Sequence, residues 1–149
     1  MKWLDLPPLW LALMIALAWG QATVVPLGLH FPGAWVDGLA VLLVLGGLGL
    51  TALALLEFRK HRTTPIPHQS ASHLIDSGIF ARTRNPIYLG DALILTGAIL
   101  WLDAVLSLIL IPLFVLLIQR RFILPEEERL ARSFPAPFQR YVERVRRWI

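Results

Sequence analysis

The stretch RTRNPIYLGDALILTGAILW, residues 82–101, decides the fold because it joins a cluster of polar groups directly to a long apolar run. Its proline, Pro86, suits the first turn of a helix, where the N–H that proline lacks would have no partner. From there to Trp101 most residues are apolar or small, and Asp91 is the one charged exception. We therefore expect a membrane helix over residues 86–101 whose entrance carries several polar groups.

The composition indicates a small all-α integral membrane protein with a single domain, residues 1–149. The chain has 149 residues, of which 56% are hydrophobic, and its mean hydropathy is +0.64. These values are too apolar for an ordinary soluble domain, and the length leaves no room for a second domain. The chain contains no cysteine, which excludes disulfides, thiolate nucleophiles and cysteine-ligated zinc.

Four apolar runs are candidates for membrane spans, which need about 20 helical residues to cross a hydrocarbon core of roughly 30 Å. We expect spans over about residues 9–29, 36–58, 86–101 and 104–123. The first run is too long for the apolar part of a signal peptide, which has about 7–15 residues, and Pro26 is expected to bend it. Asp103 is expected to cap the start of the fourth span after a tight turn at residues 102–103.

The distribution of positive charge predicts the topology. Lysine and arginine cluster at residues 59–62, 82–84 and 120–121, whereas the loop 30–37 and the turn at 102–103 have none. Because positive residues mark the cytoplasmic side, the loop 59–85, the segment 124–149 and both chain termini are expected in the cytoplasm. The segment 124–149 mixes charged and apolar side chains, which predicts an amphipathic helical segment, interrupted at Pro135 and Pro137, against the cytoplasmic face.

Two polar blocks are expected to meet at the cytoplasmic mouth of the hairpin formed by the third and fourth spans. One block precedes the third span and the other follows the fourth, so antiparallel helices bring them side by side. Tyr88 and Asp91 are three residues apart and Arg84 is four before Tyr88, which places these three on one helical face. The groups expected in this small volume are Arg84, Asn85, Tyr88, Asp91, Glu126 and Glu127.

Each of these residues also has an ordinary structural explanation. Arginines at helix ends commonly bind lipid phosphates, and a run of glutamates beside arginines is commonly a solvated, self-neutralising face. Asp91 is harder to explain in this way, because an ionisable group at mid-membrane costs about 2.5–3.5 kcal/mol on insertion scales, and less near the interface. The combination therefore favours a binding site over a set of lipid anchors.

Several other kinds of site are excluded because the sequence lacks their motifs. The sequence has no GxxxxGK[ST], GxGxxG, GxSxG or HExxH motif, and its four histidines lack the spacing of metal ligands. The arginines flank apolar runs at the depth of lipid headgroups, which argues against a nucleic-acid surface. We expect neither a metal nor a nucleic-acid partner, and we expect membrane lipids and a lipidic or hydrophobic small molecule as partners.

Two segments resemble the isoprenylcysteine carboxyl methyltransferase and phospholipid methyltransferase family of membrane enzymes, in particular its small bacterial members. They are HLIDSGIFARTRNPIYLGDALILTGAIL, residues 73–100, and RRFILPEEERLARSFPAPFQRYVERVRRWI, residues 120–149. The paired motifs SGxF…RNPxYLG and EExxL…F…Y…VRRW carry the resemblance, which covers roughly the second half of the chain. It implies an enzyme of the bacterial inner membrane that takes a methyl group from S-adenosylmethionine, leaves S-adenosylhomocysteine, and acts on a hydrophobic or lipid-attached acceptor.

The resemblance also implies which residues bind the cofactor. The donor would lie between the cytoplasmic ends of the last two spans and the C-terminal segment, with the two glutamates on its adenosine hydroxyls or methionyl amine. The implied cofactor-binding residues are Gly78, Phe80, Arg84, Asn85, Pro86, Tyr88, Leu89, Gly90, Glu126, Glu127 and Tyr141. Asn85 stands where many members have His, and the stretch FPAPF at 134–138 replaces a more usual Phe-Gly followed by Tyr, which leaves the shape of the C-terminal cap open.

The chemistry of the acceptor stays open from sequence. Methyl transfer is an in-line displacement that depends chiefly on positioning and electrostatics. A carboxylate acceptor needs no general base and could be oriented by Arg84 or Arg144. An amine must arrive deprotonated, and Asp91 or a glutamate is then the candidate proton acceptor.

Two alternatives from other functional classes also remain. One is a non-catalytic accessory protein with the same fold, which the altered FPAPF stretch favours. The other is a small transporter subunit in which Asp91 relays protons. The sequence does not indicate the oligomeric state.

Overall fold

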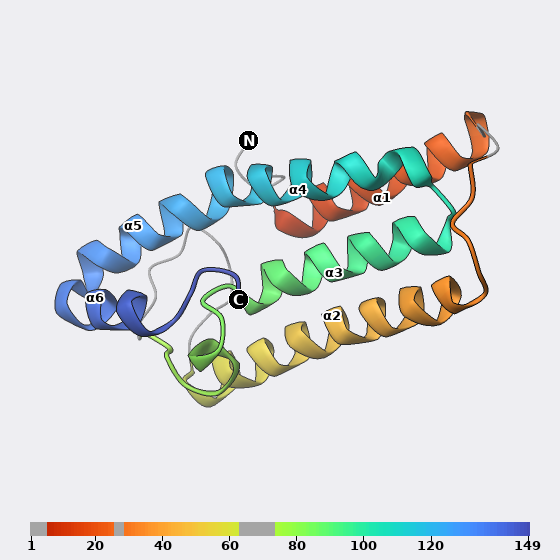
Figure 1. Cartoon of the computed structure of the whole chain (residues 1–149). Coiled ribbons are helices and arrows are strands. Elements are labelled where there is room, and N and C mark those ends of the chain that lie inside the picture. Colours follow the sequence, from red (N-terminus) through yellow and green to blue (C-terminus); the bar gives the residue numbers. More distant parts are fainter. Residues whose placement is uncertain (1–5, 26–28, 63–73) are drawn as a thin grey trace.

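The computed structural model describes residues 6–25, 29–62 and 74–149, and every regular element in these ranges is helical (Figure 1). The all-α fold expected from the sequence is therefore confirmed. The expected bend at Pro26 lies outside the described residues. The elements are α1 (Pro7–Val24), α2 (Trp35–Lys60), the 3₁₀ turn η1 (Gly78–Ala81), α3 (Pro86–Trp101), the 3₁₀ turn η2 (Val105–Ile109), α4 (Leu110–Ile118), the π-helical turn η3 (Gln119–Ile123), α5 (Leu124–Ser133) and α6 (Pro135–Arg144).

Three of the described helical stretches are long and apolar enough to cross a membrane. They are Pro7–Val24, Trp35–Lys60 and the continuous stretch Val105–Ser133. The helix α3 has the bounds expected from its proline and its apolar run, but its 16 residues make it only about 24 Å long. Whether α3 crosses as a fourth span stays a prediction.

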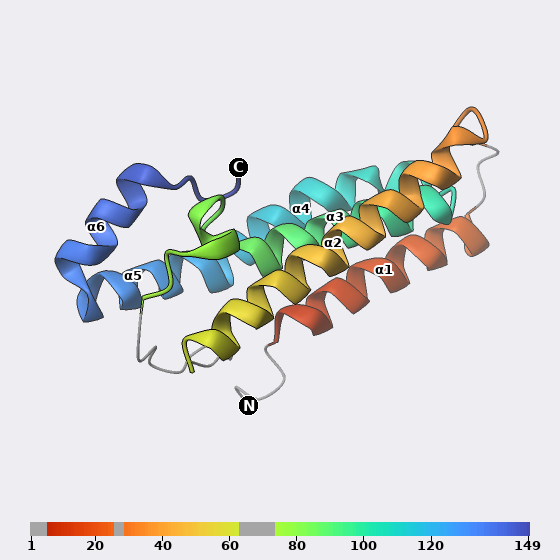
Figure 2. The ribbon, with the colours of Figure 1, turned by 90° about the horizontal axis from the view of Figure 1, so that it is seen from below.

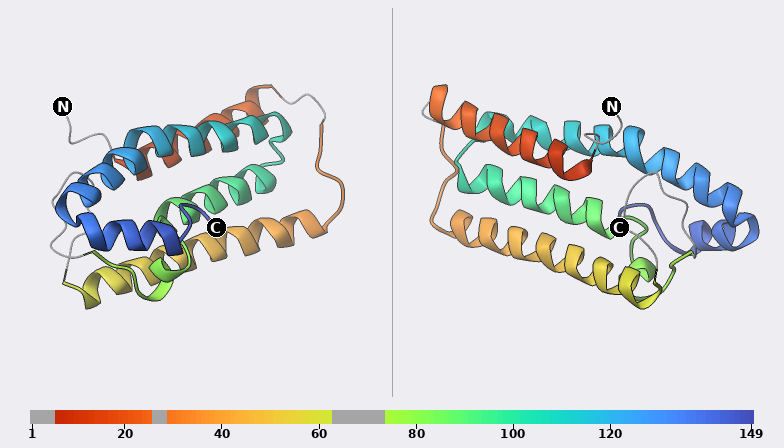
Figure 3. Two further views of the ribbon diagram at one scale, coloured as in Figure 1. Left: turned by 60° about the vertical axis from the view of Figure 1, so that its left-hand side comes forward. Right: turned by 180° about the vertical axis from the view of Figure 1, so that it is seen from behind.

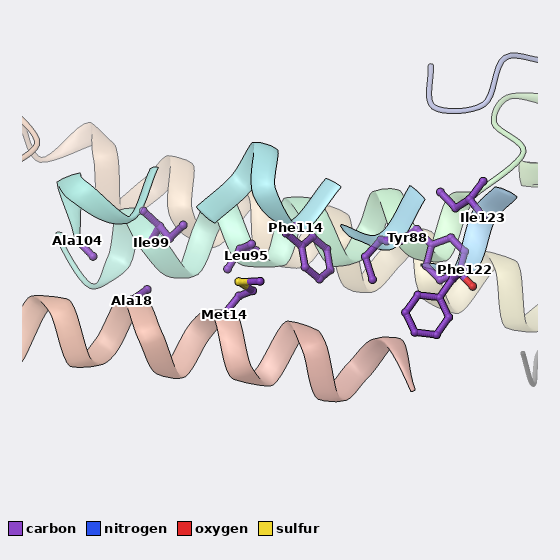
Figure 4. Packing of buried hydrophobic residues seen from close by; sticks show 10 residues of the cluster. Met14, Ala18, Tyr88, Leu95, Ile99, Ala104, Phe114, Phe122 and Ile123 are labelled. Atoms are coloured by element: carbon purple, nitrogen blue, oxygen red, sulfur yellow. The ribbon is translucent and has the colours of Figure 1, made fainter. Parts of the chain in front are cut away.

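The helix α3 occupies the middle of the bundle, with α2 on one side and α1 and α4 on the other (Figure 1). The helices α5 and α6 and the chain end lie together at one end of the bundle (Figure 2). Met14 and Ala18 of α1 point toward Leu95 and Ile99 of α3 and Phe114 of α4 (Figure 4). This apolar cluster is the main core, and the outward faces of the helices expose large apolar residues such as Leu42, which is 66% exposed. Such faces suit a lipid environment.

Glycines set the close approach of α2 and α3. A Cβ atom added to Gly47 would lie 2.5 Å from the carbonyl oxygen of Gly90, and one added to Gly97 would lie 2.7 Å from that of Ala40. Backbones that touch in this way leave no room for side chains, which is how small residues pack helices in lipid. Gly90, which the resemblance implied as a cofactor contact, thus has a structural reason to be glycine on the α2 side.

Asp103 does not cap a helix, so that expectation is wrong. It adopts a positive φ of 53°, and η2, which begins two residues later, has no side-chain cap. Its carboxylate instead accepts a hydrogen bond from the backbone N–H of Phe31 at 2.8 Å and pairs with His30. These bonds, led by that from Phe31, hold the pKa of Asp103 below its usual value. The carboxylate therefore ties the loop before α2 to the turn after α3.

Two prolines explain why the stretch Val105–Ser133 is not a uniform α-helix. Pro112 lies in the first turn of α4, where its missing N–H is tolerated, directly after the tighter turn η2. Pro125 lies at the start of α5, and it deprives the carbonyl of Arg121 of its α-helical donor. The wider turn η3 fills this position. The turn also buries Phe122 and Ile123 against the bundle just before the glutamates of α5.

The contact between α2 and α3 predicts that alanine destabilises the fold at one of two adjacent glycines and not at the other. The Gly47→Ala change should lower the free energy of unfolding by about 1–3 kcal/mol, because its Cβ would overlap the backbone of α3. The Gly46→Ala change is the control, since a Cβ there meets no atom within 4 Å. Thermal unfolding in detergent measures both, and equal shifts in melting temperature would contradict the packing described.

Candidate functional site

The start of α3 is held by the last residues of the chain. The backbone N–H of Arg84 donates to the carbonyl of Arg146 at 3.1 Å, and the side-chain amide of Asn85 donates to the carbonyl of Arg147 at 3.0 Å. We call residues 145–148 the C-terminal strap, and Figure 3 shows the chain end beside the start of α3 in both views. Trp148 also fixes the strap to η3, because its Nε1 donates to the side chain of Gln119 at 3.1 Å.

Glu127 lies between two arginines and carries the main electrostatic contact of the site. Arg84 Nη1 lies 3.0 Å from Glu127 Oε1, and the Arg147 guanidinium donates to both carboxylate oxygens at 3.0 and 2.7 Å. Arg84 and Glu127 are 10% and 16% exposed, so this pairing is largely shielded from water. The hydrogen bonds to Glu127 raise the pKa of Arg147 above its usual value. The predicted meeting of the two polar blocks is thus present in the structure.

Glu126, the preceding residue of α5, has a weaker protein partner than Glu127. The Tyr88 hydroxyl donates to Glu126 Oε2 at 3.4 Å, near the upper limit of a hydrogen bond. The Tyr88 ring packs against Phe122 with centroids 6.4 Å apart. Glu126 therefore keeps unused acceptor capacity, since an ionised carboxylate can accept about four hydrogen bonds.

A cavity of about 320 Å³ opens beside these groups. This volume is at the lower end of the range of roughly 300–1,000 Å³ that small-molecule sites occupy. Polar groups line one part of it, and α1 and α2 supply an apolar part. The lining residues are Leu6, Pro7, Pro8, Thr51, Leu55, Phe58, Phe80, Arg84, Asn85, Pro86, Ile87, Tyr88 and Glu126.

Six of the residues predicted for the cofactor line this cavity, namely Phe80, Arg84, Asn85, Pro86, Tyr88 and Glu126. Within the described ranges, Arg84 Nε is buried and has no hydrogen-bond partner. An N–H buried without a partner costs roughly 1–3 kcal/mol, so a ligand acceptor at this position would remove that free-energy cost. These contacts to a ligand stay predictions.

The other predicted residues are near the cavity without lining it. Gly78 faces Glu57, Leu89 is half-buried on α3, and Gly90 faces α2. Tyr141 is buried and donates from its hydroxyl to the carbonyl of Phe80 at 2.7 Å, so it supports a lining residue. This burial raises the pKa of Tyr141.

Two of the three predicted catalytic residues are also outside the lining. Arg144 makes an ion pair with Asp76 at 2.8 Å, and both side chains are about half-exposed or more. Asp91 is 7% exposed, and its Oδ2 has no hydrogen-bond partner in the part of the chain that the structure describes. Arg84 is the only one of the three that both lines the cavity and contacts another predicted residue.

Sequence reasoning missed Arg147 and the contribution of the first two helices. Arg147 was one of several arginines near the chain end, and the sequence did not indicate which would face the glutamates. Residues 6–8 of the chain and Leu55 and Phe58 of α2 supply much of the apolar wall. The sequence signal for a contribution from α2 was Phe58, which lies where the apolar run of α2 meets its charged end. An aromatic ring at that depth can face either lipid or a pocket.

Removing the charge of Glu127 should destabilise the fold far more than the same change one residue later. The Glu127→Gln change leaves Arg84 and Arg147 without their counterion, and breaking a buried pair in this way costs about 3–5 kcal/mol. Glu128 pairs with Arg132 at the surface, so Glu128→Gln should change the free energy of unfolding by less than about 1 kcal/mol. Denaturation of both variants in detergent checks this, and similar losses would refute the assigned role of Glu127.

Comparison with known proteins identifies the family of the chain. The family model described as phospholipid methyltransferase matches residues 36–136, from the start of α2 into α6. No curated protein and no solved structure matches the chain. The family match covers more than half of the chain and includes both polar blocks that line the site. The chain belongs to the phospholipid methyltransferase family.

Proposed function

We propose that this membrane methyltransferase transfers the methyl group of S-adenosylmethionine to a lipid-attached or hydrophobic acceptor at the cytoplasmic face. The observation that carries the proposal is the cavity at the start of α3, where Arg84 and Glu126 adjoin an apolar wall from α1 and α2. Arginine and lysine gather at this end of the bundle and are missing from the loops at the other end, which supports the cytoplasmic placement.

The residues at the polar end of the cavity fit the donor. S-adenosylmethionine carries an amino group, a carboxylate and ribose hydroxyls, and when bound it supplies an electrophilic methyl group on a sulfonium. Glu126 has spare acceptor capacity for the amine or the hydroxyls. Arg84 has a buried, unpartnered Nε among the described residues, which suits the donor's carboxylate.

Among the two acceptor classes, the geometry favours an amine. Arg84 and Arg144 are the arginines expected to orient a carboxylate acceptor, but Arg144 pairs with Asp76 outside the cavity, and Arg84 is already assigned to the donor's carboxylate. Among the described lining residues the acidic group is Glu126, and the acceptor capacity it keeps beside the donor can stabilise a cationic amine and accept its proton. The apolar wall of α1 and α2 would hold the acyl portion of such a lipid.

Asp91 favours a second candidate function, proton relay in a small transporter subunit. A carboxyl group buried in an apolar bundle with one oxygen unpartnered, among the residues described, commonly marks a proton path. The family match covers Asp91 without distinguishing its role. The two functions differ in what Asp91 must do, and substitution separates them.

Binding of the product S-adenosylhomocysteine tests the proposal. Calorimetry on the purified protein should detect binding, and Glu126→Gln should weaken it by roughly tenfold or more, since a hydrogen bond to a charged group is worth about 1.5–3 kcal/mol. Glu128→Gln is the matched control and should leave the affinity unchanged. Absence of binding by the folded wild type would refute the proposal, and labelled methyl donor with a total lipid extract would identify the acceptor.

The Asp91→Asn change should leave product affinity within about twofold of wild type, because Asp91 does not line the cavity. It should not lower the melting temperature, since it replaces a buried, unpartnered carboxylate with a neutral isostere. Proton flux in the wild type that this variant loses, with no methyl transfer by either protein, would favour the transporter. Lost methyl transfer with no proton flux in the wild type would assign Asp91 to the methyl-transfer reaction.

A further inference from the structure

A polar cluster outside the cavity joins the end of α2 to the loop before η1. The Ser77 hydroxyl donates to Glu57 Oε2 at 2.8 Å, and His61 Nε2 lies 3.0 Å from the same hydroxyl. His61 and Lys60 also lie 3.5 and 3.7 Å from the Glu57 carboxylate. The Glu57 side chain is only 15% exposed, so the cluster is a largely buried contact between the end of α2 and the loop before η1.

Gly78 packs against the Glu57 carboxylate of this cluster and does not line the cavity. Its φ is +57°, a conformation that side chains rarely adopt. A Cβ atom there would also lie 2.4 Å from Glu57 Oε1 and 2.5 Å from its carboxyl carbon. The glycine therefore lets the Glu57 carboxylate close against the backbone of the loop.

The loop that Glu57 holds carries a wall of the cavity. Phe80 lies two residues after Gly78 and lines the cavity, and its ring meets Phe58 edge-to-face with centroids 5.5 Å apart. Phe80 also packs in a small core with Ala54 and Ile75. On its other side, the carbonyl of Phe80 accepts the hydrogen bond from Tyr141. Phe80 is thus fixed from α6 on one side and from α2 on the other.

We infer that Glu57 is a positioning residue for the donor site, which acts through Ser77 and the backbone at Gly78 to hold Phe80 in the cavity wall. This inference rests on the proposed function, because it assumes that the cavity binds the donor. Glu57 touches none of the cavity's polar groups among the described contacts, and its contribution is the geometry of the loop. Its oxygen matters here as a hydrogen-bond acceptor more than as a charge.

The inference predicts a specific order of effects among variants. Glu57→Ala and Ser77→Ala each remove the same hydrogen bond, so each should weaken S-adenosylhomocysteine binding by roughly tenfold. The double variant should be no weaker than either single variant, since contacting residues are not additive. Glu57→Gln keeps an oxygen that accepts from Ser77 and should bind within about threefold of wild type. Glu143→Ala removes an exposed carboxylate on α6 and is the charge-matched control.

Calorimetry gives the affinities, and thermal unfolding without ligand shows whether each variant is folded. Weaker binding by the two alanine variants, recovery in Glu57→Gln and a non-additive double variant support the inference. Equal loss in Glu57→Gln and Glu57→Ala, or full affinity in folded Ser77→Ala, would overturn it while leaving the proposed function in place. Failure of the wild type to bind would overturn both.

Discussion

Charge pairing in a place with little water is the constraint on which the rest of this structure depends. Arg84 and Glu127 are both largely shielded, and neither would be stable there without the other. Their pairing joins the start of α3 to the start of α5, and Arg147 adds the C-terminal strap to the same carboxylate. Segments far apart in the sequence are thereby fixed around one cavity. Because Glu127 is occupied by arginines, Glu126 is the acidic group among the described lining residues that keeps free acceptor capacity toward that cavity.

The packing of α2 on α3 supplies the rigid frame for this arrangement. Gly47, Gly90 and Gly97 allow backbone contact, so the start of α3 and the end of α2 are held at a set distance. The cavity lies where the two helices reach the polar end of the bundle, and both contribute to its lining. Helix contact in the apolar region thus fixes α2 against α3, and ion pairing at the polar end fixes the start of α3 to α5 and to the C-terminal strap.

The parts of the fold that follow from local chemistry could be predicted from the sequence. Pro86 and the turn at residues 102–103 gave α3 its bounds, and the antiparallel hairpin brought Arg84 to Glu127. What could not be predicted depends on which neighbour a side chain meets. A glycine signals close approach without naming the partner, and Gly78 and Gly90, which the resemblance implies as cofactor contacts, face Glu57 and α2 in the structure. Asp103 has the residue type of a cap, but a left-handed turn directs it to Phe31. In a helix that is apolar all round, the sequence does not indicate whether a residue such as Leu55 faces lipid or the cavity that it lines.

The bond between Asp103 and the loop at Phe31 has a mechanical consequence. It ties the connection between α1 and α2 to the turn after α3, at the end of the bundle opposite the cavity. Since α1 and α2 lie on opposite sides of α3, this bond anchors the described part of the segment that leads from one side of the bundle to the other, residues 29–34. A connecting segment anchored part-way along its path has fewer accessible conformations than one held only by the helices at its two ends, so the bond lowers the entropy of that segment before ligand binding is considered.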